Sequence, residues 1–179
     1  MSTNNVSLGA TRLAQMLART KTRIVFAESC TCGLLAATLG EVPGISQWLC
    51  GSAVVYQEST KSAWLDVSPE MIERCGVVSE DVARAMAVGV LGTTPHADVA
   101  VSVTGHLGPN APAELDGVVH AAIAFRSAND IEIACRMLQL RNETESDGMA
   151  VRLERRLRTT SFLLEWTAEF LAVRSQLAG

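Results

Sequence analysis

Two side chains whose types suit acyl transfer, Ser29 and Lys61, stand near the ends of predicted strands. Ser29 lies in the stretch 26–33, where an apolar strand ends in a tight turn of small residues that presents the serine outward. A serine hydroxyl is a weak nucleophile until a neighbouring base takes its proton. The three histidines are scattered along the chain, which leaves Lys61 as the candidate base. Its pKa must fall well below the ordinary lysine value for that task, and an exposed surface lysine is the simpler interpretation of the spacing.

The turn after Ser29 also has the features of an anion or oxyanion site. The pattern predicts a helix over 31–39, so that the backbone N–H groups near Thr31, Cys32 and Gly33 converge at the positive end of the helix dipole. Such a point suits a phosphate or an oxyanion. A simpler interpretation stays open, in which Ser29 and Thr31 only cap the helix, as these residue types often do.

Further polar residues follow the second and third predicted strands, where α/β folds gather their functional groups. Tyr56 can relay a proton or bind substrate, although a tyrosine that ends a buried strand more often packs there with its hydroxyl satisfied. The Thr104 hydroxyl can hold a phosphate or carboxylate where Gly105 lets a ligand approach the backbone. Thr-Gly is also an ordinary end to a strand.

The predicted helices and strands that position these residues are expected to form one α/β domain over residues 1–179, with helices on both faces of the sheet. Strands are predicted over 23–27, 51–57, 98–104, 118–126 and 131–140, the last two as a hairpin. Helices are predicted around 8–21, 31–39, 58–65, 69–75, 80–92 and 148–177. The second strand is rich in Val and Tyr, which indicates that it is buried.

Composition and charge exclude several classes of protein. The chain has 179 residues, 48% of them hydrophobic, and a net charge of −4 without a dense Lys/Arg run, so we expect no nucleic-acid partner. A local basic cluster (Arg152, Arg155, Arg156 and Arg158) alternates with Glu154 and leucines. This pattern is typical of a solvated helix face, with a small anionic ligand as the alternative. No apolar run is long enough to span a membrane, so we expect a soluble protein.

Cysteine usage indicates a reducing compartment. The five cysteines make an odd count, with no CxxC pair and no secretory leader before them. Cys30 and Cys32 lack a second Cys/His pair at metal-binding spacing. We therefore expect a cytoplasmic protein with no metal and no cofactor.

Four segments in order resemble one known family: Ala27–Ala36, Gly51–Lys61, Val78–Ala87 and Thr104–Pro109. They are similar to the CinA C-terminal domain family, whose stand-alone members include nicotinamide-nucleotide amidases. The similarity runs from about Leu8 to Ala124 and more loosely to the end. It implies a three-layer α/β/α sandwich with a mixed, mainly parallel sheet. It also implies hydrolysis of the carboxamide of nicotinamide mononucleotide (NMN), giving nicotinate mononucleotide and ammonia without a metal.

The resemblance also implies roles for single residues. Ser29 matches the nucleophile, Lys61 the base and Tyr56 its hydroxyl partner. We expect contacts to a small nucleotide substrate from Thr31, Cys32, Gly33, Thr104, Gly105 and Arg141. At the turn we favour the oxyanion over the phosphate as the group that is held, because those amides are tied to Ser29.

The chain departs from the family pattern in its pocket segments. Cys32 replaces the first of two glycines, the segment 110–116 is short, and His120 stands where an aromatic residue is expected. These departures keep two alternatives open. One is a catalytically impaired relative that binds a nucleotide or a protein partner, and the other is a hydrolase for a different amide.

The last third of the chain matches the family loosely. The Phe-x-Gly-Asp-Arg motif is reduced to 138–142, which leaves Arg141 as its match and Arg152 as a competing phosphate partner. The final helix has more large apolar side chains than one face needs, so we expect a homodimer.

Overall fold

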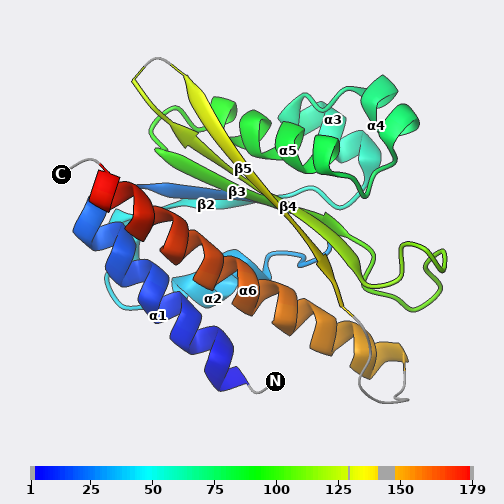
Figure 1. Ribbon diagram of the computed structural model, residues 1–179, viewed down its shortest axis with the longest axis horizontal. Coiled ribbons are helices and arrows are strands. Elements are labelled where there is room, and N and C mark those ends of the chain that lie inside the picture. The colour runs from blue at the N-terminus through cyan, green and yellow to red at the C-terminus, as the bar shows by residue number, and fades with distance from the viewer. Residues whose placement is uncertain (1–2, 129, 141–147, 178–179) are drawn as a thin grey trace.

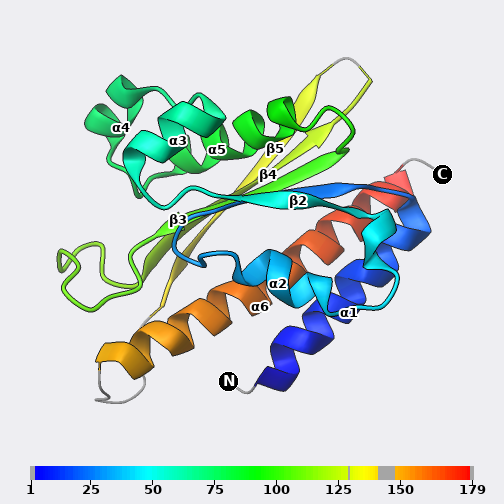
Figure 2. The ribbon, with the colours of Figure 1, turned by 180° about the vertical axis from the view of Figure 1, so that it is seen from behind.

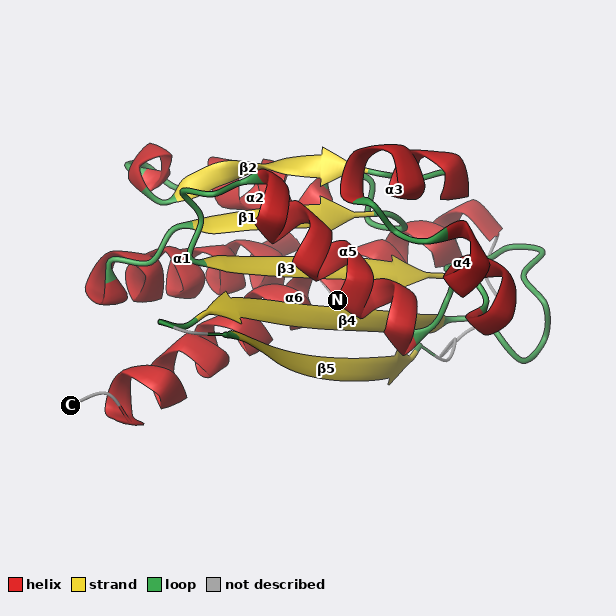
Figure 3. Ribbon diagram, turned by 90° about the horizontal axis from the view of Figure 1, so that it is seen from above, coloured by secondary structure: helices red, strands yellow, loops and turns green. Residues whose placement is uncertain are grey.

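The protein is built around one mixed five-stranded sheet. The computed structural model describes residues 3–128, 130–140 and 148–177. The strands are β1 (Ile24–Glu28), β2 (Leu49–Val54), β3 (Val99–Gly105), β4 (Val118–Arg126) and β5 (Ile131–Gln139). Their order across the sheet is β2-β1-β3-β4-β5 (Figure 3). β1 pairs in parallel with β2 and β3, whereas β4 is antiparallel to β3 and β5, which confirms the mixed sheet.

Helices cover both faces of the sheet. One layer contains α1 (Thr3–Thr20), α2 (Leu34–Gly40) and α6 (Gly148–Leu177), and the other contains α3 (Glu58–Leu65), α4 (Pro69–Cys75) and α5 (Glu80–Thr93) (Figures 1 and 2). A single 3₁₀ turn, η1 (Ile45–Gln47), precedes β2. Successive side chains of β1 alternate between two apolar clusters: Phe26 packs toward α1 and α6, and Ala27 packs toward α5. The predicted three-layer sandwich is thus confirmed.

Local signals in the sequence located most helix starts. Pro69 begins α4 after Ser68, whose hydroxyl accepts a hydrogen bond from the Met71 N–H at 3.2 Å. Ser79 caps α5 in the same way, accepting from the Val82 N–H at 3.3 Å. Both serines satisfy helix N–H groups that have no partner within the helix.

Two expectations about elements were wrong. The second strand is not buried, because β2 forms an edge of the sheet and is partly exposed along its length. Its Val-rich pattern does not distinguish an edge from a central position. The helix predicted from Thr31 begins only at Leu34, because Cys32 and Gly33 have φ angles of 54° and 86°, which a right-handed helix cannot include.

The longest helix, α6, has 30 residues and packs alongside α1. Its large apolar side chains Leu163, Trp166 and Leu171 are buried in the core of this chain. Packing within the chain therefore accounts for much of the apolar surface that led us to expect a homodimer, which stays a prediction. In the part of the chain that the structure describes, no helix is long and apolar enough to cross a membrane.

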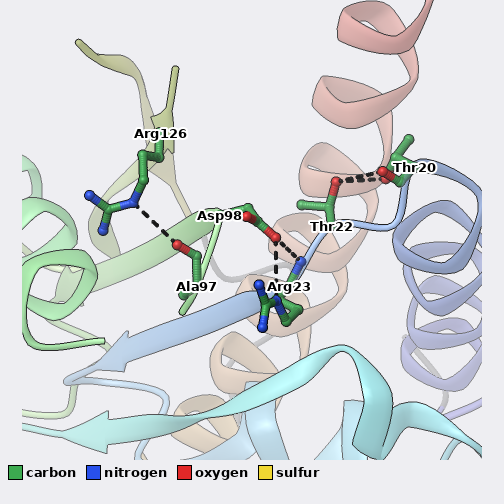
Figure 4. Close-up of polar contacts among 6 residues, drawn as sticks. All are labelled: Thr20, Thr22, Arg23, Ala97, Asp98 and Arg126. Atoms are coloured by element: carbon green, nitrogen blue, oxygen red, sulfur yellow. Dashed lines mark hydrogen bonds and ion pairs between the residues drawn. The ribbon is translucent and has the colours of Figure 1, made fainter. Parts of the chain in front are cut away.

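The amino-terminal ends of β1 and β3 are joined by polar contacts. Asp98 accepts a hydrogen bond from the Arg23 backbone N–H at 2.7 Å, and the Arg23 guanidinium lies 3.8 Å from the same carboxylate oxygen (Figure 4). The Arg126 Nε–H donates to the Ala97 carbonyl at 3.4 Å, from the far side of β3. These contacts hold strand ends together, and the candidate site lies at the opposite end of the sheet.

Candidate active site

The structure brings Ser29 and Lys61 together where β1 ends. Ser29 follows β1 directly, and Lys61 projects from α3, in the helix layer that also contains α4 and α5. Lys61 Nζ donates a hydrogen bond to Ser29 Oγ at 3.0 Å. It also donates to the carbonyl oxygens of Val55 at 2.8 Å and Tyr56 at 3.2 Å. Lys61 is 0% exposed, so the interpretation of this residue as a surface lysine was wrong.

Burial controls the protonation of this pair. Loss of water around the amine lowers the pKa of Lys61, and charges on Cys30 and Glu58 oppose that shift. The Cys30 thiol offers little opposition in practice, because its own burial raises its pKa to about 12 and keeps it neutral. Among the described residues, Lys61 forms no ion pair with a carboxylate within 4.0 Å. A neutral amine beside Ser29 can accept the hydroxyl proton.

The turn after Ser29 is not the first turn of a helix. The Ser29 N–H donates to the Val103 carbonyl of β3, and the Cys32 N–H donates to the Ser29 carbonyl, both at 3.0 Å. α2 then starts at Leu34 after Gly33, and no side chain of its N-cap residue contributes a hydrogen bond. The expectation that Ser29 or Thr31 caps this helix was therefore wrong.

Glu28 occupies the amino terminus of α2, a role that our sequence interpretation missed. One carboxylate oxygen accepts from the Thr31 hydroxyl at 2.8 Å and the Leu35 N–H at 3.0 Å. The other accepts from the Ala36 N–H at 3.1 Å and the Ser52 hydroxyl at 3.0 Å. The free amides of the helix thus face Glu28 and not a ligand, which corrects the expected anion site at the helix terminus. A carboxylate in the last position of an apolar strand was the available signal.

Arginines of α6 contact the loops of the site. Arg152 donates to the Tyr56 hydroxyl at 2.5 Å and to the Gly108 carbonyl at 2.6 Å. Arg156 donates to the Thr31 carbonyl at 3.0 Å. The interpretation of this cluster as a solvated face was wrong, because helical periodicity does not reveal which loops pack on a helix.

Arg155 attaches the loop between β3 and β4 to α6. Its side chain is 3% exposed, and its guanidinium donates to both carboxylate oxygens of Asp116, each at 2.7 Å. These hydrogen bonds lower the pKa of Asp116. The loop protrudes at the end of the sheet where α6 begins (Figure 1). A two-bond arginine–carboxylate pair of this kind fixes orientation as well as distance.

Tyr56 contributes its backbone to the Ser29–Lys61 pair and its side chain to Arg152. The side chain is 52% exposed, and its hydroxyl accepts from the Arg152 guanidinium. The expected buried tyrosine was thus wrong, whereas its hydroxyl is satisfied as expected. Arg141, the residue expected to contact the substrate, lies outside the described residues.

Thr104 and Gly105 lie at the end of β3 in roles that packing explains. The buried Thr104 hydroxyl donates to the Val77 carbonyl at 2.9 Å. A Cβ on Gly105 would lie 2.8 Å from the Val118 carbonyl, so the neighbouring strand already requires glycine there. His120 pairs with Thr104 across β3 and β4, and burial lowers the pKa of its imidazole.

Cys32 carries a backbone conformation that favours glycine, and this leads to a prediction. With φ at 54°, its side chain costs about 1 kcal/mol relative to glycine. We expect Cys32→Gly to raise the melting temperature by about 2–4 °C. Differential scanning calorimetry measures the change. Cys32→Ala is the matched control, because it removes the thiol but keeps the strained conformation; equal gains from both variants would contradict the backbone explanation.

Comparison with known proteins identifies relatives of this chain. The family model described as the CinA C-terminal domain matches residues 8–159. A CinA-like protein of Myxococcus xanthus is 38% identical over 136 residues, which cover 73% of this chain and 31% of that protein. A CinA-like protein of Prochlorococcus marinus is 38% identical over 141 residues, covering 78% of this chain and 33% of that protein. The chain thus spans about a third of the length of these curated relatives.

Solved structures agree with the family match. The competence/damage-inducible protein CihA from Agrobacterium tumefaciens superposes with a TM-score of 0.81 at 30% identity, covering 93% of this chain and 96% of that one. A CinA superfamily protein from Klebsiella pneumoniae gives a TM-score of 0.81 at 25% identity, with 93% and 98% covered. Since the family model spans most of the chain and the same fold recurs in these structures, the chain belongs to the CinA C-terminal domain family.

Proposed function

We propose that the protein is an amidohydrolase that converts NMN to nicotinate mononucleotide and ammonia. The observation that carries this proposal is the 3.0 Å contact between Ser29 Oγ and a fully buried Lys61 Nζ that has no carboxylate partner among the described residues. Burial favours the neutral amine, which is the form needed to activate a serine. Family membership, with the amidases that the motifs resemble, supports the choice of an amide substrate.

The proposed reaction proceeds in two halves. Ser29 Oγ attacks the carboxamide carbon while Lys61 takes the hydroxyl proton, and the carbonyls of Val55 and Tyr56 stabilise the resulting ammonium. Lys61 then gives its proton to the departing nitrogen, and ammonia leaves an ester on Ser29. Water attacks the ester, with Lys61 accepting its proton and returning it to Ser29 Oγ.

The tetrahedral intermediate needs hydrogen-bond donors for its oxyanion. The amides of Leu35 and Ala36 donate to Glu28, and the amide of Cys32 donates to the Ser29 carbonyl. We propose the amide of Gly33 as a donor, since it has no hydrogen-bond acceptor among the described residues and Gly33 is partly exposed, whereas Thr31 is fully buried. This choice retains the turn as the oxyanion site, whereas the Leu35 and Ala36 amides of α2 bind Glu28.

Arg152 is the proposed partner of the substrate phosphate. Neither Arg152 nor Arg156 forms an ion pair with a carboxylate within 4.0 Å in the described ranges. Both guanidiniums contact uncharged oxygens beside the turn and Tyr56. A phosphate is a stronger partner for arginine than these neutral acceptors, so an anionic substrate is favoured over a neutral one.

Cys32 does not favour the alternative of a catalytically impaired relative. Its side chain is exposed, and the turn keeps the Ser29–Lys61 contact despite the cysteine. The geometry therefore supports hydrolysis over binding alone.

Ammonia release from NMN by the purified protein tests the proposal. We expect NMN to be converted to nicotinate mononucleotide with one ammonia per turnover, and nicotinamide riboside, which lacks the phosphate, to be a poorer substrate. Chromatography of the nucleotides and an ammonia assay measure both products. A folded protein that binds NMN in calorimetry without releasing ammonia would contradict the proposal, as would equal turnover of an unrelated amide.

A further inference from the structure

Glu28 connects three elements around the Ser29 turn. Its carboxylate accepts four hydrogen bonds, from Thr31 in the turn, from Leu35 and Ala36 in α2 and from Ser52 in β2. We propose that Glu28 is a positioning residue, which fixes the backbone of the Ser29 turn so that Ser29 Oγ stays in line with Lys61. This inference rests on the proposed hydrolase function.

The network requires both side-chain oxygens of Glu28 to act as hydrogen-bond acceptors. Backbone N–H groups only donate, and each carboxylate oxygen receives one of them, from Leu35 or from Ala36. A glutamine has one oxygen and one NH₂ group, so its NH₂ would face a backbone N–H and leave it without an acceptor. Glu28 is fully buried, so that loss is not replaced by water.

The Glu28 side chain lies on the opposite face of the sheet from the Ser29–Lys61 pair. Strand alternation directs its side chain toward α2 and the Ser29 side chain toward α3. The Glu28 carbonyl accepts from the Val55 N–H at 2.9 Å, and the Val55 carbonyl accepts from Lys61 at 2.8 Å. The Glu28 backbone therefore supports both Ser29, which follows it in the chain, and the Val55 carbonyl, which orients Lys61.

Glu28→Gln tests the inference. We expect kcat for NMN to fall about tenfold to a hundredfold, because displacing the turn misaligns the nucleophile, while KM stays within about twofold. We also expect backbone hydrogen exchange at Ser29 and Cys32 to accelerate about tenfold or more. Ser68→Ala is the matched control: it removes a helix cap from α4, away from the turn, so it lowers stability without altering kcat or exchange at Ser29.

Hydrogen exchange separates this inference from the proposed function. Unchanged exchange at Ser29 and Cys32 in Glu28→Gln would overturn the positioning role, and so would a fall in kcat that Ser68→Ala reproduces. If the wild type releases no ammonia from NMN, the proposed function fails, and exchange at the turn still decides whether Glu28 holds it. If Glu28→Gln does not fold, Ser52→Ala removes only one of the four donors and is expected to change kcat and exchange in the same direction by a smaller factor.

Discussion

Replacing Ser29 with alanine is expected to lower ammonia release from NMN by at least about a thousandfold. The variant loses the oxygen that forms the ester, and no other hydroxyl is hydrogen-bonded to Lys61 Nζ among the described residues. Folding should be retained, because Lys61 keeps its hydrogen bonds to the Val55 and Tyr56 carbonyls. Steady-state ammonia release, with thermal unfolding measured on the same samples, gives both quantities.

A second serine provides the matched control for Ser29→Ala. Ser59 is exposed on α3, two residues from Lys61 along the chain, and takes no part in the proposed reaction. Ser59→Ala should keep the wild-type rate. A Ser29→Ala variant that retains more than a tenth of the activity would show that water attacks the amide directly, and would remove serine from the mechanism.

The sequence was sufficient for the parts of the site that depend on short stretches of chain. The strand–turn stretch at Ser29 and the helix that carries Lys61 are both local patterns, and the bounds predicted for the helix, 58–65, match α3. The contact between the two residues follows from the parallel pairing of β1 with β2, which brings the segments after both strands to one edge of the sheet.

Long-range contacts explain what was missed. The Glu28 carboxylate in β1 accepts a hydrogen bond from Ser52 in the neighbouring strand β2. The Arg156 guanidinium donates to the Thr31 carbonyl, which lies 125 residues earlier in the chain. Neither contact produces a periodic pattern in the sequence from which it could be predicted. The start of α2 was misplaced for a local reason, because a cysteine at φ 54° gives no sign that the backbone there is left-handed. Glycine at that position would have been such a sign.

The buried amine of Lys61 has opposite consequences for stability and activity. Burial lowers its pKa below the unfolded value of 10.5, so the unfolded state binds more protons over the pH range between the two pKa values. The stability of the wild type should therefore rise with pH through that range, as the cost of burying a charge is removed. Methionine has a similar length and no charge, so Lys61→Met should unfold at the same or a higher temperature at neutral pH.

Lys61→Met should nevertheless lower ammonia release by about a hundredfold to ten-thousandfold, because no base remains to take the Ser29 proton. In the wild type, kcat should rise with pH as Lys61 loses its proton, and the stability difference between the two proteins should narrow toward pH 10.5. Thermal unfolding and steady-state rates across a pH series measure both trends.

Lys21→Met is the control, because Lys21 is exposed and its loss should alter neither trend. A Lys61→Met variant that keeps the wild-type rate would contradict the base, whereas one that is less stable at neutral pH would show that the hydrogen bonds of the amine outweigh the cost of burying it.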